Sequence, residues 1–143
     1  MRLHPADPAR REWLLAAAAV TLAGLASPAT AAAPPEVSLD EARAAHQGGG
    51  VTLIDIREPD EHATGVAAGA RLLPMSQLPR RLDEIPQDPD RPVLLICRTQ
   101  NRSGSVVDAL RKRGYTNVRF VRGGMKAWAE RGWPMVPPEA APK

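Results

Sequence analysis

The sequence contains one cysteine, Cys97, and few aromatic residues. A single cysteine excludes a disulfide within the chain and any metal site built from several cysteines. An aromatic content of 3% is too low for a surface on which nucleic-acid bases stack. The formal net charge of +3 is a small basic excess that does not indicate a nucleic-acid partner. His46 and His62 stand apart, at a spacing typical of no metal site, so we expect no metal, cofactor or nucleic acid to bind.

The remaining composition is that of a folded domain. Hydrophobic residues make up 43% and charged residues 24% of the 143 residues. These fractions exclude a disordered or collagen-like chain, and the length corresponds to about one domain.

The first thirty-one residues have the pattern of an export signal. Arg10 and Arg11 precede an apolar run over residues 13–26, which is shorter than the ~20 residues of a membrane span. Small residues at 29–31 then match a signal-peptidase site. The alternative, an alanine-rich helix of the domain, is less favoured because the run has no polar face and Pro34 and Pro35 follow it.

Residues 9–15 also resemble a twin-arginine export signal, in which an aromatic residue and leucine follow the two arginines. Ala9 stands where such signals usually carry a hydroxyl, so an ordinary secretory signal stays open as the other route. Either route predicts a periplasmic or secreted protein. No cysteine lies near the cleavage site, so we expect no stable membrane anchor after cleavage.

Strand and helix patterns alternate after residue 35. Nearly continuous apolar and β-branched runs predict buried strands over 51–56 and 93–96. A third strand is expected over 118–121, with a short edge strand at 72–73. A capping box from Ser38 to Glu41 begins a helix that ends near His46, and further helices are expected over 76–85, 103–113 and 125–131. This alternation predicts an α/β domain with a mostly parallel sheet. Ligands bind such sheets beyond the carboxyl ends of the strands, where Cys97 lies.

A polar loop follows Cys97 and leads into a predicted helix. Its backbone N–H groups and the start of that helix create a positive potential, which favours the thiolate form of the cysteine. The loop holds no histidine, so its electrostatics would have to activate the nucleophile. An inert buried cysteine is the alternative, but the polar run is an unusual choice for packing. The loop residues are Arg98, Thr99, Gln100, Asn101, Arg102 and Ser103.

Four segments, in order, resemble the motifs of one family. Residues 54–61 resemble a D-x-R-x-x-x-E segment, 69–74 a G-A-x-x-x-P segment, 97–102 a six-residue active-site loop and 121–128 a closing G-G-x-x-A-W segment. The chain thus resembles a single-domain rhodanese-like sulfurtransferase over about residues 36–136. The resemblance implies a three-layer α/β domain with a mostly parallel five-stranded sheet flanked by helices. We expect 1–31 to be the signal peptide, 32–35 a linker and 137–143 a flexible tail.

The resemblance also implies a chemical mechanism. The thiolate of Cys97 would take the outer sulfur of thiosulfate or a related small anion, and the N–H groups of residues 98–102 would hold the persulfide. A thiol or cyanide would then remove the sulfur, and a protein acceptor is also open. Arg102 would hold the loop or the substrate. Asp55, Arg57 and Ser103 would support the loop, although Asp55 and Arg57 also fit a plain strand-end salt bridge.

The sequence departs from the family's motifs at two places, and three other functions are considered. Gln100 stands where the family commonly has glycine, and residues 65–70 lack the histidine and proline of the usual segment. A tyrosine-phosphatase loop needs arginine six positions after the cysteine, where Ser103 stands. A redox reductase is disfavoured because the chain has no resolving cysteine. A non-catalytic binding or sulfur-relay module serving a partner protein stays open, although the cysteine is kept.

Overall fold

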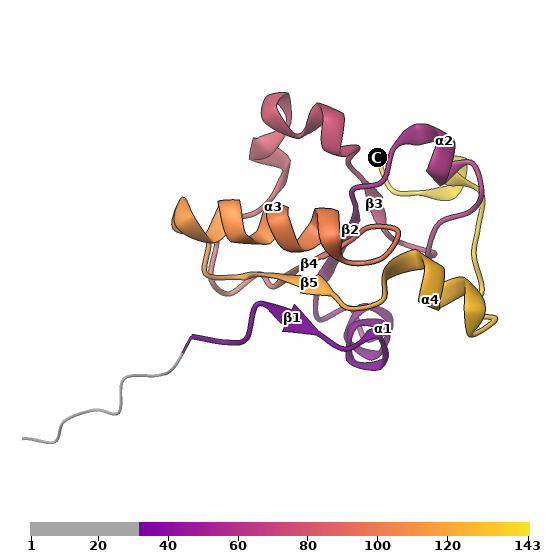
Figure 1. Ribbon diagram of the computed structural model, residues 1–143, viewed down its shortest axis with the longest axis horizontal. Helices are drawn as coiled ribbons and strands as arrows, with labels where there is room; N and C mark the ends of the chain where they lie inside the picture. The colour runs from indigo at the N-terminus through magenta and orange to yellow at the C-terminus, as the bar shows by residue number, and fades with distance from the viewer. Residues whose placement is uncertain (1–31) are drawn as a thin grey trace, which may run out of the picture. The chain divides into compact units, whose positions relative to one another are not determined.

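A computed structural model describes residues 32–143, so the predicted export signal lies outside the described residues. Five strands form one sheet in the order β1-β5-β4-β2-β3, and every neighbouring pair is parallel (Figure 1). The predicted mostly parallel α/β sheet is therefore confirmed and is parallel throughout. The strands are β1 (Glu36–Val37), β2 (Thr52–Asp55), β3 (Arg71–Leu72), β4 (Val93–Ile96) and β5 (Val118–Val121).

Strand β4 lies at the centre of the sheet and is buried along its whole length. Side chains alternate between the two faces of a strand, so a strand covered on both sides reads as a continuous apolar run. Leu95 and Cys97 join the core cluster on one face, whereas Leu94 and Ile96 join the cluster on the other. This alternation assigns the Cys97 side chain to a defined face of the sheet.

Helices cover both faces of the sheet and complete the three layers. The face of Cys97 packs against α3 (Asn101–Lys112) and the 3₁₀ turns η1 (Met75–Arg80) and η2 (Leu82–Glu84). The opposite face packs against α1 (Leu39–Gln47) and α4 (Gly124–Glu130). Figure 1 shows α3 and α1 on opposite sides of the sheet. The single turns α2 (Pro59–His62) and η3 (Pro138–Ala140) lie outside these layers.

The boundaries differ from the sequence predictions in four places. The predicted helix over 76–85 is wrong, because the segment forms two 3₁₀ turns instead. Pro79 has no backbone N–H to donate to an α-helical hydrogen bond. Helix α3 begins at Asn101, two residues earlier than predicted and inside the polar loop. Strand β1 and helix α2 were not predicted, because two and four residues are too few to show a period. The capping box of Ser38 and Glu41 is confirmed. Among residues 32–143, no helix is long and apolar enough to cross a membrane.

The segment 133–136, here called the C-terminal arm, returns to the end of the sheet that carries α2. Val66 and Val136 exchange two backbone hydrogen bonds of 2.9 Å in an antiparallel bridge. Trp128 of α4 is buried, as predicted, and its indole N–H donates to the Pro134 carbonyl at 3.1 Å. Hydrogen bonds at Pro134 and Val136 thus hold the C-terminal arm in place.

Candidate active site

Cys97 follows β4 directly and lies at the carboxyl end of the sheet, as predicted. Its side chain is only 1% exposed. The sulfur lies 3.3 Å from the hydroxyl oxygen of Ser103 and accepts a hydrogen bond from the Ser103 amide at 3.5 Å. Ser103 is itself fully buried and also donates to the Gln100 carbonyl. The cysteine therefore faces the first turn of α3, and Ser103 supports the loop on which it stands.

The loop offers backbone donors next to this sulfur. Within the described part of the chain, the N–H groups of residues 98–102 have no hydrogen-bond acceptor. Helix α3 begins inside the loop, so its unpaired amides and its dipole add positive potential there. A negative charge beside the sulfur would be stabilised by donors that are already in place.

The first turn of α4 holds the loop from one side by two backbone hydrogen bonds. The amides of Met125 and Lys126 donate to the carbonyl oxygens of Cys97 and Arg98, both at 2.8 Å. With these carbonyls engaged by α4, the loop backbone is fixed at its first two residues. The G-G-x-x-A-W segment therefore acts on the active-site loop itself as well as packing α4 on the sheet.

Gly124 is the residue that permits this close approach. It has φ +60°, and a Cβ on it would lie 2.3 Å from the Thr99 carbonyl oxygen and 2.5 Å from that of Cys97. Only glycine adopts this conformation readily and leaves room for the loop backbone. Thr99, a predicted loop residue, thus contributes its backbone to the contact.

Gln100 reaches across to the same turn. Its side-chain oxygen accepts a hydrogen bond from the Gly123 amide at 3.0 Å. The residue that departs from the family's common glycine is therefore a second tether between the loop and the β5–α4 turn. The sequence shows Gln100 only as a departure from the family's common glycine, because this contact joins positions 23 residues apart.

Arg102 is held by Glu61 of α2 in a two-pronged ion pair. Its two terminal nitrogens lie 2.7 and 2.6 Å from the two carboxylate oxygens. The Arg102 hydrogen bond lowers the pKa of Glu61 to about 2, against an opposing effect of partial burial. Glu61 also accepts a hydrogen bond from the Glu58 amide at 3.0 Å and so caps the start of α2. The pair joins α2 to α3. In the sequence, the glutamate that ends the D-x-R-x-x-x-E segment indicated one of the two partners.

Asp55 and Arg57 form a buried ion pair at the end of β2. Arg57 donates to both carboxylate oxygens, at 2.7 Å in the shortest contact, and to the carbonyls of Glu61 and Gly65. Burial would raise the pKa of Asp55, but His62, 3.4 Å away, and Arg57 together hold it below the usual value. This is the strand-end salt bridge foreseen as an alternative, and it connects to the loop through Glu61 and Arg102.

The other two loop residues lie at the surface. Asn101 opens α3 and accepts from the Ser105 hydroxyl through its carbonyl at 3.0 Å. Arg98 is exposed, and its guanidinium makes no hydrogen bond or ion pair with any described residue. Among the described residues, the Arg98 side chain is therefore without a partner, whereas that of Arg102 forms an ion pair with Glu61.

We predict that Gly124→Ala destabilises the protein far more than Gly132→Ala. Both glycines have positive φ, at +60° and +64°, but a Cβ at Gly132 meets nothing within 4 Å. Gly132→Ala should cost about 1 kcal/mol of backbone strain, and Gly124→Ala about 2–4 kcal/mol through overpacking as well. Urea unfolding of both variants measures the difference. Equal losses would show that the loop yields to the new methyl group.

We also predict that the Arg102–Glu61 pair makes stability depend on pH. Because the folded pKa of Glu61 is about 2, below its ordinary 4.5, its stabilising effect is complete above about pH 5 and is lost as the pH falls toward 2. Glu61→Gln should lower the free energy of unfolding by about 1 kcal/mol at pH 7, since solvent screens the partly exposed pair. The gap from wild type should narrow between pH 5 and pH 3 in denaturant titrations. A gap that stays constant over this range would contradict the assignment.

Comparison with known proteins agrees with this geometry. The rhodanese-like domain model matches residues 38–131. A sulfurtransferase of Allochromatium vinosum is 45% identical over 89 residues, which are 62% of this chain and 81% of that protein. A human single-domain sulfurtransferase superposes with a TM-score of 0.62 at 27% identity, covering 68% of this chain and 97% of the other.

A thiosulfate sulfurtransferase from Pseudomonas aeruginosa is similar over a shorter part of its own length. It superposes with a TM-score of 0.62 at 26% identity, covering 71% of this chain and 20% of that protein. The family model covers well over half of the chain described above and includes the whole of the Cys97 loop. The chain belongs to the rhodanese-like family, with sulfurtransferases among its relatives.

Proposed function

We propose that the protein transfers a sulfane sulfur from thiosulfate, or a related anion, to a thiol or cyanide acceptor through a persulfide on Cys97. The Cys97 thiolate attacks the outer sulfur of thiosulfate and forms a new S–S bond. The S–S bond of thiosulfate breaks, and sulfite leaves with its electron pair. An acceptor thiolate then takes the outer sulfur as its own persulfide, and Cys97 returns as a thiolate.

One observation carries this proposal. The Cys97 sulfur lies beside a loop whose N–H groups at residues 98–102 have no acceptor in the described part of the chain. A persulfide adds one sulfur and keeps a negative charge at that point, and fixed donors stabilise such a charge without reorganising. The attack is proposed for the Cys97 thiolate, which is the nucleophilic form of a cysteine.

The relatives support the proposal without naming the acceptor. The similar proteins from Allochromatium vinosum and from humans are sulfurtransferases, and that of Pseudomonas aeruginosa is a thiosulfate sulfurtransferase. Because Cys97 is the only cysteine of the chain, its persulfide has to be discharged by an external acceptor. A small thiol and a protein thiol are both compatible with that requirement.

We predict that incubation with thiosulfate adds one sulfur atom to the protein. Intact-mass spectrometry should show the added mass on wild type, its loss on treatment with cyanide, and no gain on Cys97→Ser. The serine variant is a matched control because it keeps the size and the hydrogen-bonding capacity of the buried side chain. Absence of the gain in wild type, or an equal gain in the variant, would refute the proposed chemistry.

We further propose that the protein is exported, on the evidence of residues 1–31. N-terminal sequencing of the protein from its native source should then begin at Ala32. Replacing Arg10 and Arg11 together by lysine should leave the precursor in the cytoplasm if the twin-arginine route is used, and normal export of that variant would assign the general secretory route. A protein that retains Met1 would contradict export by either route.

A further inference from the structure

A cavity of about 340 Å³ lies beside the active-site loop. It is lined by Arg98 of the loop, Glu61 of α2, residues of α4 and Met135 of the C-terminal arm. The cavity belongs to the same end of the molecule as Cys97, since the amide of Met125, which lines it, donates to the Cys97 carbonyl. Any molecule bound there would lie next to the first residue of the loop.

Part of the lining of this cavity is apolar. Met125 is buried, and Ala129 of α4 adds a methyl group. Met135 is 39% exposed, one of two large hydrophobic residues of the described chain that are exposed, and it packs over Gly65. Hydrocarbon on a ligand could therefore be removed from water at this place, which a purely ionic site does not offer.

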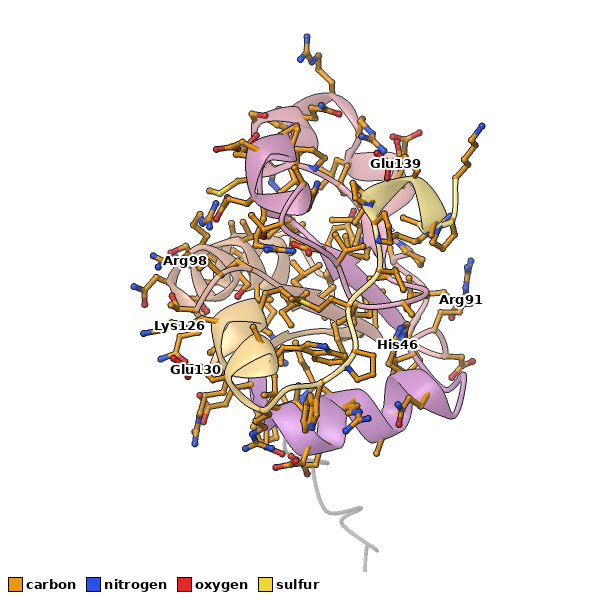
Figure 2. All side chains as sticks on the ribbon, turned by 90° about the vertical axis from the view of Figure 1, so that its right-hand side faces the viewer. His46, Arg91, Arg98, Lys126, Glu130 and Glu139 are labelled. Carbon is orange, nitrogen blue, oxygen red and sulfur yellow. The ribbon has the colours of Figure 1, made fainter. Side chains whose placement is uncertain are left out.

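Two cations of the cavity lining, Arg98 and Lys126, have no close ion-pair partner among the described residues. Arg98 has no ion-pair partner among the described residues, and Lys126 has only a 3.8 Å contact with Glu130 in which both side chains are more than half exposed. Figure 2 shows Arg98, Lys126 and Glu130 along one side of the molecule. The remaining charges of the lining, Arg57 and Glu61, are engaged with Asp55 and Arg102, so the charge available to a ligand is positive on balance.

We propose that this cavity is the acceptor subsite and that it selects a small thiol bearing a carboxylate. The carboxylate would lie against Arg98 and Lys126, and the carbon chain against Met125 and Met135. The inference rests on the proposed sulfur transfer and concerns its second half. Thiosulfate is a small dianion without hydrocarbon, so the apolar part of the lining, Met125, Ala129 and Met135, suits an organic thiol better.

The charges of the reactants explain why cations would be needed when the acceptor discharges the persulfide. The acceptor thiolate attacks the outer sulfur of the Cys97 persulfide, a new S–S bond forms, and the bond to the cysteine sulfur breaks with its electron pair on Cys97. An anionic acceptor meets an anionic persulfide, so the encounter is repulsive without fixed cations nearby. Arg98 and Lys126 supply that compensation, whereas an uncharged thiol has no carboxylate for them to bind.

The test uses full-length protein loaded with thiosulfate, freed of excess donor and followed by intact-mass spectrometry as the persulfide is discharged. The acceptors are 3-mercaptopropionate and 3-mercapto-1-propanol, which are similar in length and differ by the carboxylate. For wild type we expect a discharge rate constant about tenfold larger for the carboxylate thiol, the size of one charge-assisted hydrogen bond. In Lys126→Glu the ratio of the two rate constants should fall to about one or below.

Lys112→Glu is the matched control, because it changes the net charge equally at an exposed position in the last turn of α3. It should keep the wild-type ratio. The proposal is overturned if wild type discharges both thiols equally fast, if Lys112→Glu lowers the ratio as much as Lys126→Glu, or if neither small thiol discharges the persulfide and only a thiol-bearing protein does. Failure of the persulfide to form would instead refute the proposed function, so the two failures are distinguishable.

Discussion

Two backbone hydrogen bonds hold the active-site loop in its conformation: the amides of Met125 and Lys126 donate to the carbonyl oxygens of Cys97 and Arg98. A loop with unpaired N–H groups would otherwise be free to turn its own carbonyls toward the sulfur. Because α4 takes those carbonyls, the remaining amides are left for an anion. This contact requires the backbones to approach closely, which explains why a glycine with positive φ stands at position 124. Sheet packing, which fixes α4 against β4 and β5, is therefore a condition for the conformation of the Cys97 loop.

The charged residues around the loop divide into structural and available groups. Asp55 with Arg57 and Glu61 with Arg102 are paired with one another, and these pairs connect β2, α2 and α3. Two arginines that looked alike in the sequence thus have different roles, since Arg102 is engaged by a carboxylate and Arg98 is not. Catalytic loops commonly combine such fixed and free charges, because orientation of the loop and attraction of the substrate need different partners.

Much of the fold could be predicted because its signals are local. The buried strands β2 and β4 appear as nearly continuous apolar runs, and the cysteine loop consists of consecutive residues. The wrong helix over 76–85 shows the limit of that reasoning, since Pro79 and the packing against α3 select 3₁₀ turns there. Contacts between distant positions could not be predicted in this way: the Arg102–Glu61 pair spans 41 residues and the Gln100–Gly123 bond 23. Each of them depends on how the finished sheet brings its loops together.

A crystal structure of the protein after thiosulfate treatment would show whether the loop amides hold a persulfide on Cys97. We expect one additional sulfur bonded to the cysteine sulfur, within hydrogen-bond distance of the amides of residues 98–102, with the loop backbone unchanged. An unmodified cysteine, or an added sulfur that meets carbonyl oxygens in a rearranged loop, would contradict this expectation.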